Sequence, residues 1–327
     1  MKNPDPCVAA GPAWGRPGGR LALALALALA LSLGAGCSIQ RVAVNRLSDT
    51  LARGSNSFAS DDDPELIRGA APFSLKLMES LLAENPEHPG LLHASASSFA
   101  QYAYAFVQLD ADEMEDDNLA KATAMRARAK RLYLRARNYG LRGLDVAHPG
   151  FRAQLSANPH EAVRHAKRPD VALLYWSAAS WAAAISLAKD EPALLGEIPQ
   201  MEALMDRALE LDEGFDHGAI HTFFITYEMA RAGASGDPAA RARKHFERAL
   251  ELAQGSHIGP LLAFAEAVCV QKQDLHQFDE LLKQALAMNP DAYPETRLAN
   301  LVLQRRARWL LTRRDELFLI PDAPKKP

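Results

Sequence analysis

The chain has 327 residues, of which 48% are hydrophobic and 24% carry a charge, and its formal net charge at pH 7 is −3. This length is enough to bury a sizeable core in one or two domains. The small negative charge creates no global basic field, so the composition excludes a protein that binds nucleic acid or an anionic membrane through its overall charge.

The N-terminus has the pattern of a secretory signal peptide. Lys2, Arg16 and Arg20 lie in a polar segment that precedes an apolar run from Leu21 to Leu33. A helix needs about 20 residues to cross the hydrocarbon of a bilayer, and this run has only 13. It fits the apolar region of a signal peptide instead. We therefore predict that residues 1–36 are removed on export.

The residues after this run resemble the cleavage site of a bacterial lipoprotein. Gly34, Ala35 and Gly36 lead directly into Cys37, which would be acylated and become the new N-terminus. Gly34 stands where such signals usually have leucine, and an ordinary cleavable signal with an incidental cysteine is the alternative. An acylated cysteine would anchor the chain stably. With Ser38 next to it, we expect lipid attachment at the periplasmic side of the outer membrane.

Residues 37–62 are predicted to form a tether, residues 63–320 a helical-repeat domain and residues 321–327 a disordered tail. Apolar residues in the long middle part recur with helical spacing, as at Met201, Leu204, Met205, Ala208 and Leu209. Such a stripe is typical of an amphipathic helix. No segment shows a convincing alternation of apolar and polar residues, which a strand would require. The predicted fold class is all-α.

Prolines and helix endings divide this part of the chain. Asp63 and Asp237 each precede a proline, the order expected where a helix begins. Helix endings look alike where Ala-Leu pairs start at Ala208, Ala249 and Ala285, at intervals of 41 and 36 residues. Periods of this size predict an α-α superhelix, or solenoid, of about four tetratricopeptide-like helical hairpins. A non-repeating helical bundle is the alternative.

A charged region lies between the first predicted helices. Asp110 to Asp117 contains six acidic residues among eight and is predicted to be a loop. It precedes a predicted helix from Arg126 to Arg142 that carries seven Lys or Arg residues, with Leu132 and Tyr133 among them. We interpret the basic residues as the solvated face of an amphipathic helix.

Catalytic motifs are not found in the sequence. It has no His-Glu-x-x-His, Cys-x-x-Cys or Gly-x-Ser-x-Gly pattern and no phosphate-binding glycine loop. Cys269 lies in an apolar stretch and is expected to pack as a small hydrophobic residue. His217 and His221 are four residues apart, which predicts one helix face, but a zinc site needs three or four ligands. We expect no metal and no cofactor, with these histidines lining a groove or satisfying buried hydrogen bonds.

Aromatic and polar residues suggest where a groove could lie. Trp176 and Trp181 are five residues apart on one predicted helix, so one is expected in the core while the other could line a concave surface. Arg305 and Asn300 lie on or beside the apolar face of a later helix. A buried guanidinium must be paired, so Arg305 could hold an organic carboxylate, reach solvent or bind a carboxylate of a loop. For the tryptophans, the alternative is that both are core residues.

Several segments of the chain form a recognisable series: Tyr175–Trp181, Glu202–Asp212, Asp216–His221, Ala242–Leu252, Asn300, Arg306-Ala307 and Asp315–Phe318. In this order they resemble the T-component lipoproteins associated with TRAP (tripartite ATP-independent periplasmic) transporters. The resemblance implies a non-catalytic periplasmic protein that partners the solute-binding protein of the transporter. It also implies a small organic ligand held in a helical groove or pore, and a homo-oligomer. Trp176, Trp181, His217, His221 and Asn300 are the matching groove residues.

Two other classes of function remain open at this point. The first is a protein-interaction scaffold for cell-envelope assembly, in which the groove of a tetratricopeptide-like repeat takes a peptide. The second is a hydrolase or metal protein built around His217, His221 and the acidic residues just upstream. An accessory transport component is the hypothesis that the resemblance favours.

Overall fold

The computed structural model describes residues 55–319, and every regular element in this range is a helix. The all-α fold class is therefore confirmed. The predicted signal peptide, the lipid site at Cys37, most of the tether and the tail at 321–327 lie outside the described residues. Within the described range, no helix is both long and apolar enough to span a membrane.

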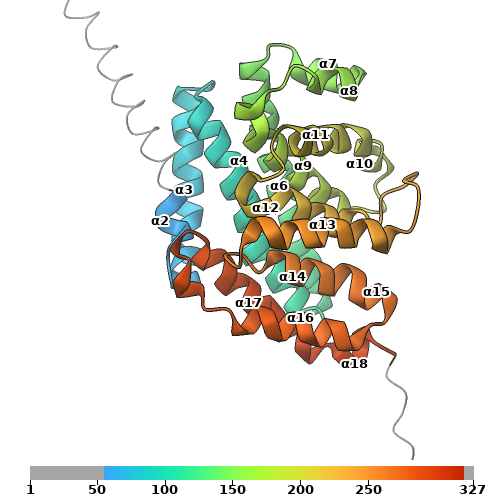
Figure 1. The fold of residues 1–327 in the computed structure, drawn as a ribbon. Coiled ribbons are helices and arrows are strands. Elements are labelled where there is room, and N and C mark those ends of the chain that lie inside the picture. Colours follow the sequence, from blue (N-terminus) through green and yellow to red (C-terminus); the bar gives the residue numbers. More distant parts are fainter. Residues whose placement is uncertain (1–54, 320–327) are drawn as a thin grey trace, which may run out of the picture. The chain divides into compact units, whose positions relative to one another are not determined.

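Figure 1 labels most of the helices. In chain order they are α2 (Ser55–Ala59), α3 (Pro64–Glu84), α4 (Pro89–Ala103), η1 (Tyr104–Gln108), α5 (Leu109–Glu113), α6 (Leu119–Ala147), α7 (Phe151–Ala157), α8 (Pro159–Val163), η2 (Arg168–Asp170), α9 (Val171–Ser186), α10 (Pro192–Leu195), α11 (Ile198–Leu211), α12 (Phe215–Tyr227), α13 (Pro238–Ala253), α14 (Gly259–Phe264), η3 (Ala265–Cys269), α15 (Val270–Lys272), α16 (Leu275–Ala287), η4 (Pro290–Ala292), η5 (Pro294–Thr296), α17 (Arg297–Thr312) and α18 (Arg314–Leu317).

Helix starts follow the predicted proline pattern. The Asp63 carboxylate accepts hydrogen bonds from the backbone N–H groups of Glu65 and Leu66, both at 3.0 Å, at the start of α3. Asp237 accepts one from Ala240 N at 2.9 Å at the start of α13. These bonds satisfy N–H groups that have no partner within the helix. Both predicted N-caps are confirmed.

Helices that follow one another along the chain pack side by side. The extensive contacts are α4 with α6, α6 with α9, α9 with α11 and α12 with α13, and the later part adds α16 with α17. Small residues allow close approach at one of these interfaces, because a Cβ on Gly140 would lie 2.1 Å from Ser177 Oγ. The assignment of these helices to tetratricopeptide-like hairpins stays a prediction.

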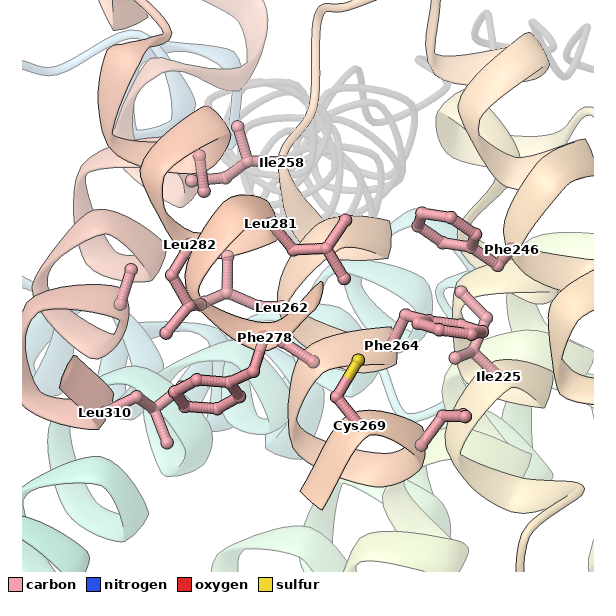
Figure 2. Packing of buried hydrophobic residues seen from close by; sticks show 14 of the residues in the cluster. Ile225, Phe246, Ile258, Leu262, Phe264, Cys269, Phe278, Leu281, Leu282 and Leu310 are labelled. Carbon is pink, nitrogen blue, oxygen red and sulfur yellow. The ribbon is translucent and has the colours of Figure 1, made fainter. Parts of the chain in front are cut away.

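The C-terminal half has a core of aromatic and aliphatic side chains (Figure 2). Phe264 and Phe278 are fully buried, and Phe246 lies 4.5 Å from Phe264 between ring centroids. Cys269 belongs to this cluster with 1% of its surface exposed, and burial raises the pKa of its thiol to about 12. It packs as a small hydrophobic residue, as predicted.

The acidic segment after α4 differs from the prediction. Its first residues form α5 rather than a loop, since α4, η1 and α5 run without a break from Pro89 to Glu113. Arginines neutralise the crowded carboxylates: Arg126 Nη2 lies 2.9 Å from Asp112 and 2.7 Å from Glu115. These ion pairs remove the repulsion that would disfavour a helix of like charges.

The last long helix returns to the first ones. Helix α17 contacts α2 and α3. Arg305 of α17 lies 2.7 Å from Asp110 and 2.6 Å from Glu113, and Arg306 lies 2.8 Å from Glu266 and 3.3 Å from Asp112. Residues almost 200 positions apart are therefore joined by ion pairs.

Candidate functional site

Helix α12 begins with a left-handed turn. Asp216, His217 and Gly218 have φ values of 46°, 56° and 83°. Such backbone is unfavourable for residues with a Cβ, although Asp and His adopt it more readily than most. Gly218 is required here, because its added Cβ would lie 3.0 Å from Leu252 Cβ, on the neighbouring α13. Strained backbone held by close packing is a feature of binding and catalytic sites.

His217 is fixed by a hydrogen bond to the loop between α13 and α14. Its Nδ1 lies 3.1 Å from Ser256 Oγ. The Ser256 hydroxyl donates its hydrogen to Ala253 O at 2.6 Å, so its oxygen must accept from His217 Nδ1–H. With Nδ1 as the donor in this bond, Nε2 is the ring nitrogen of His217 that is left for another partner.

Asn300 of α17 holds the same loop from the other side. This side chain is completely buried. Its Oδ1 accepts from Ile258 N at 3.1 Å, and its Nδ2 donates to Ser256 O at 2.8 Å and to Thr296 Oγ1 at 3.0 Å. Asn300 therefore supports the residues that position His217 and presents no free polar group itself.

Aromatic rings lie beside the left-handed turn. Tyr175 of α9 makes an edge contact with Trp176 at 5.0 Å and a tilted contact with Phe215 at 5.3 Å between ring centroids. Burial, and then the charge of Asp216, raise the pKa of Tyr175 well above its usual range. Tyr175 and Trp176 nevertheless keep part of their surface exposed. They lie deep but remain accessible, as ligand-binding residues must.

His257 completes this group. Burial lowers its pKa, with Asp216 opposing and His217 adding to the effect. Its Nδ1 accepts from Gly259 N at 2.9 Å, which leaves Nε2 for another partner. We name Tyr175, Trp176, Asp216, His217 and His257 the turn site. It combines two aromatic rings, a carboxylate and two imidazoles, and it can bind an apolar group by stacking and a polar group by hydrogen bonds.

His221 belongs to a different place, contrary to the expected shared face with His217. The left-handed turn interrupts the regular helix between them, so the four-residue spacing does not place the two side chains on one helix face. His221 is buried, with its Nδ1 2.9 Å from His245 Nδ1 and its Nε2 3.2 Å from Glu213. It contributes to the wall of an open cavity of about 520 Å³ that Arg168 and Asp212 also line.

The histidine pair is held in the neutral form. Burial lowers the pKa of His221, although Glu213 works against this shift. Burial and the nearby His221 lower the pKa of His245 to about 4. The His245 ring stacks on Phe224 with centroids 4.9 Å apart. Within residues 55–319, no group of three or more His, Cys, Asp or Glu side chains could hold a metal ion.

Trp181 and Arg305 have structural partners. Trp181 is 5% exposed, donates its indole N–H to Glu197 at 2.8 Å and lies 4.7 Å below the Arg137 guanidinium. Trp176, in contrast, keeps part of its surface exposed, so the alternative in which both tryptophans are core residues does not hold. Arg305 binds Asp110 and Glu113, so it pairs with carboxylates of the chain, although these belong to helix α5 and not to a loop as predicted. Whether either residue contacts a ligand or partner stays a prediction.

The structure adds residues that the sequence did not single out. Ser256, His257 and His245 follow the predicted histidines by 24 to 40 positions, and only the packing of α12 against α13 and the next loop brings them together. The only sequence signal near the turn was Gly218, which follows two residues that tolerate left-handed backbone.

These features define an all-helical protein with a half-buried aromatic and histidine site. Among protein families, the model of the TRAP transporter T-component family matches residues 60–318. The chain belongs to this family. It is also 30% identical over 303 residues to an uncharacterized protein of Treponema pallidum (strain Nichols), with 87% of this chain and 94% of that protein covered. The members of this family are accessory components of transport systems, and the family is not one of enzymes.

Proposed function

We propose that this protein is a periplasmic lipoprotein that binds the solute-binding protein of a TRAP-type transport system. The observation that carries the transport role is the family match over residues 60–318. The lipid anchor at Cys37 and the outer-membrane location rest on the N-terminal sequence pattern. The helices would then form a tetratricopeptide-like superhelix, in which inner helices offer a surface to a partner.

We place the binding of a small organic ligand at the turn site. Trp176 offers an apolar face, while His217 and His257 each have one ring nitrogen fixed by a hydrogen bond and the other left for a ligand. The half-buried rings of Tyr175 and Trp176 would exclude water from the ligand. This arrangement favours a ligand with an apolar body and one or two polar groups.

A capture experiment tests the partner. The full chain, with a C-terminal tag, is solubilised from native membranes in a mild detergent, and bound proteins are identified by mass spectrometry. We expect a stoichiometric periplasmic solute-binding protein. Recovery of envelope-assembly proteins instead would favour the scaffold alternative, and recovery of nothing above background would contradict the transport proposal.

A pair of variants tests the turn site. Trp176→Ala should weaken capture of the solute-binding protein or remove a co-purifying small molecule. The matched control is Phe73→Ala, which removes an aromatic ring that is 73% exposed on α3. If both variants behave like the unchanged protein, the turn site is not the place of binding, although the transport role itself would stand.

A further inference from the structure

Helix α6 and the start of α7 form a basic groove that the proposed function does not use. Its cavity measures about 460 Å³. The residues that line it are Arg131, Leu134, Arg135, Asn138, Tyr139, Arg142 and Arg152. None of them belongs to the turn site. We name these seven residues the arginine groove.

The arginine groove has a local excess of positive charge. Arg135 lies 3.3 Å from Glu79, a carboxylate that also binds Lys76 and accepts a hydrogen bond from Tyr139 at 2.8 Å. Arg131, Arg142 and Arg152 form no ion pair with any carboxylate of residues 55–319. Three guanidinium groups that form no ion pair within the described residues thus gather around one cavity in a chain whose net charge is −3.

The walls of the groove present donors rather than acceptors. Asn138 Oδ1 accepts from Nε and Nη2 of Arg137, both at 3.2 Å, so the part of this amide left for the cavity is its NH₂ group. Arg135 is held in place, because its guanidinium lies 5.4 Å from the Phe99 ring centroid and Glu79 binds it from the side. The Tyr139 ring stacks on the same Phe99 at 5.7 Å. Part of the site is therefore fixed before a ligand arrives.

We propose that the arginine groove binds a phosphate group. Guanidinium groups bind phosphate oxygens in paired hydrogen bonds, and several can share one phosphate because it has a tetrahedral set of oxygens. A single carboxylate carries one charge and two oxygens, so it would leave most of these donors without a partner. The apolar floor at Leu134 and the Tyr139 ring would contact the organic part of a phosphate ester. The source is either a soluble phosphate compound or the headgroup of an anionic phospholipid.

Two titrations distinguish the sources. Isothermal titration calorimetry at low ionic strength would use the full chain in a non-ionic detergent. One titrant is inorganic phosphate, and the other is a short-chain phosphatidylglycerol below its micelle concentration, with the corresponding phosphatidylcholine as its comparison. Binding of phosphate alone indicates a soluble ligand, and a clear preference for phosphatidylglycerol indicates a headgroup. The proposal is overturned if neither titrant binds.

Matched variants test whether the groove is the site. Arg131→Gln with Arg152→Gln removes two exposed side chains that bind no carboxylate in the described part of the chain, so folding should be kept. We expect the Kd for the bound titrant to rise at least about tenfold, because each hydrogen bond to a charged group contributes about a factor of ten or more. The control is Arg308→Gln with Lys283→Gln, which removes the same charge from exposed positions of α17 and α16.

The control variant should bind like the unchanged protein. Equal weakening in both double variants would mean that only the total charge matters, and it would overturn the assignment of the site. Arg131→Lys with Arg152→Lys keeps the charge but loses the planar fork. This variant should bind between the unchanged protein and the glutamine variant, and thermal melting of all variants checks that they remain folded.

Discussion

Substitution of Asn300 by alanine should weaken both the fold and the turn site. Asn300 is completely buried, and its amide satisfies Ile258 N–H and shares Ser256 O with Thr296. Loss of the amide leaves Ile258 N–H buried without a partner, which costs about 1–3 kcal/mol. The lost bond to Ser256 O adds about 1 kcal/mol. We expect the free energy of unfolding to fall by about 3 kcal/mol.

Urea denaturation of the full chain, followed by circular dichroism, measures this change. Thr296→Val is the comparison variant, because it removes the donor to Ser256 O at 2.6 Å together with one acceptor for Asn300 Nδ2, and it should cost about 1–2 kcal/mol, less than Asn300→Ala. The double variant should lose less than the sum of the two, since both residues serve the same carbonyl. A loss below about 1 kcal/mol for Asn300→Ala would refute the view that this amide supports the loop.

Three further predictions concern stability. Gly218→Ala should lower the free energy of unfolding by about 1–3 kcal/mol more than Gly150→Ala in urea denaturation, because both have positive φ but only Gly218 lacks room for a Cβ. His245 has its folded-state pKa lowered to about 4, so its contribution to stability is present above pH 6.5 and is lost as pH falls from there toward 4. Urea denaturation at several pH values should therefore show a flatter decline for His245→Gln than for the unchanged protein, and equal slopes would contradict this. Trp181→Ala should lower the free energy of unfolding by about 3–5 kcal/mol and Trp176→Ala by clearly less, because Trp181 is the core residue of the two. Thermal and urea unfolding measure this difference.

The sequence predicted what depends on local patterns. Helices appear where apolar residues recur with helical spacing, and Asp63 and Asp237 cap helices because the cap needs only residues within one turn. Cys269 is buried in an apolar stretch, as its neighbours indicated. The division of Trp176 and Trp181 between accessible surface and core followed from their five-residue spacing, since such residues point in different directions on a helix.

What could not be predicted depends on tertiary contacts. The acidic residues at 110–113 form helix because arginines of α3, α6 and α17 bind them, and no local rule supplies those partners. The left-handed turn at Asp216 to Gly218 needs Leu252 and Ser256 to hold it. For the same reason His217 and His221 lie apart: His217 bonds to Ser256 in the loop after α13, and His221 bonds to His245 of α13.

The ion pairs of α17 also concern the order in which the chain is made. Arg305 and Asp110 are 195 residues apart. The ion pairs between α5 and α17 can therefore form only after one of the last helices has been synthesised. Contacts of such separation slow folding, because a long loop must close before they form. Shortening the chain from its C-terminus would therefore leave Glu113 without its arginine and Asp110 with Arg68 alone, so a truncated product should be less stable than the full chain even though the sequence of its first helices is intact.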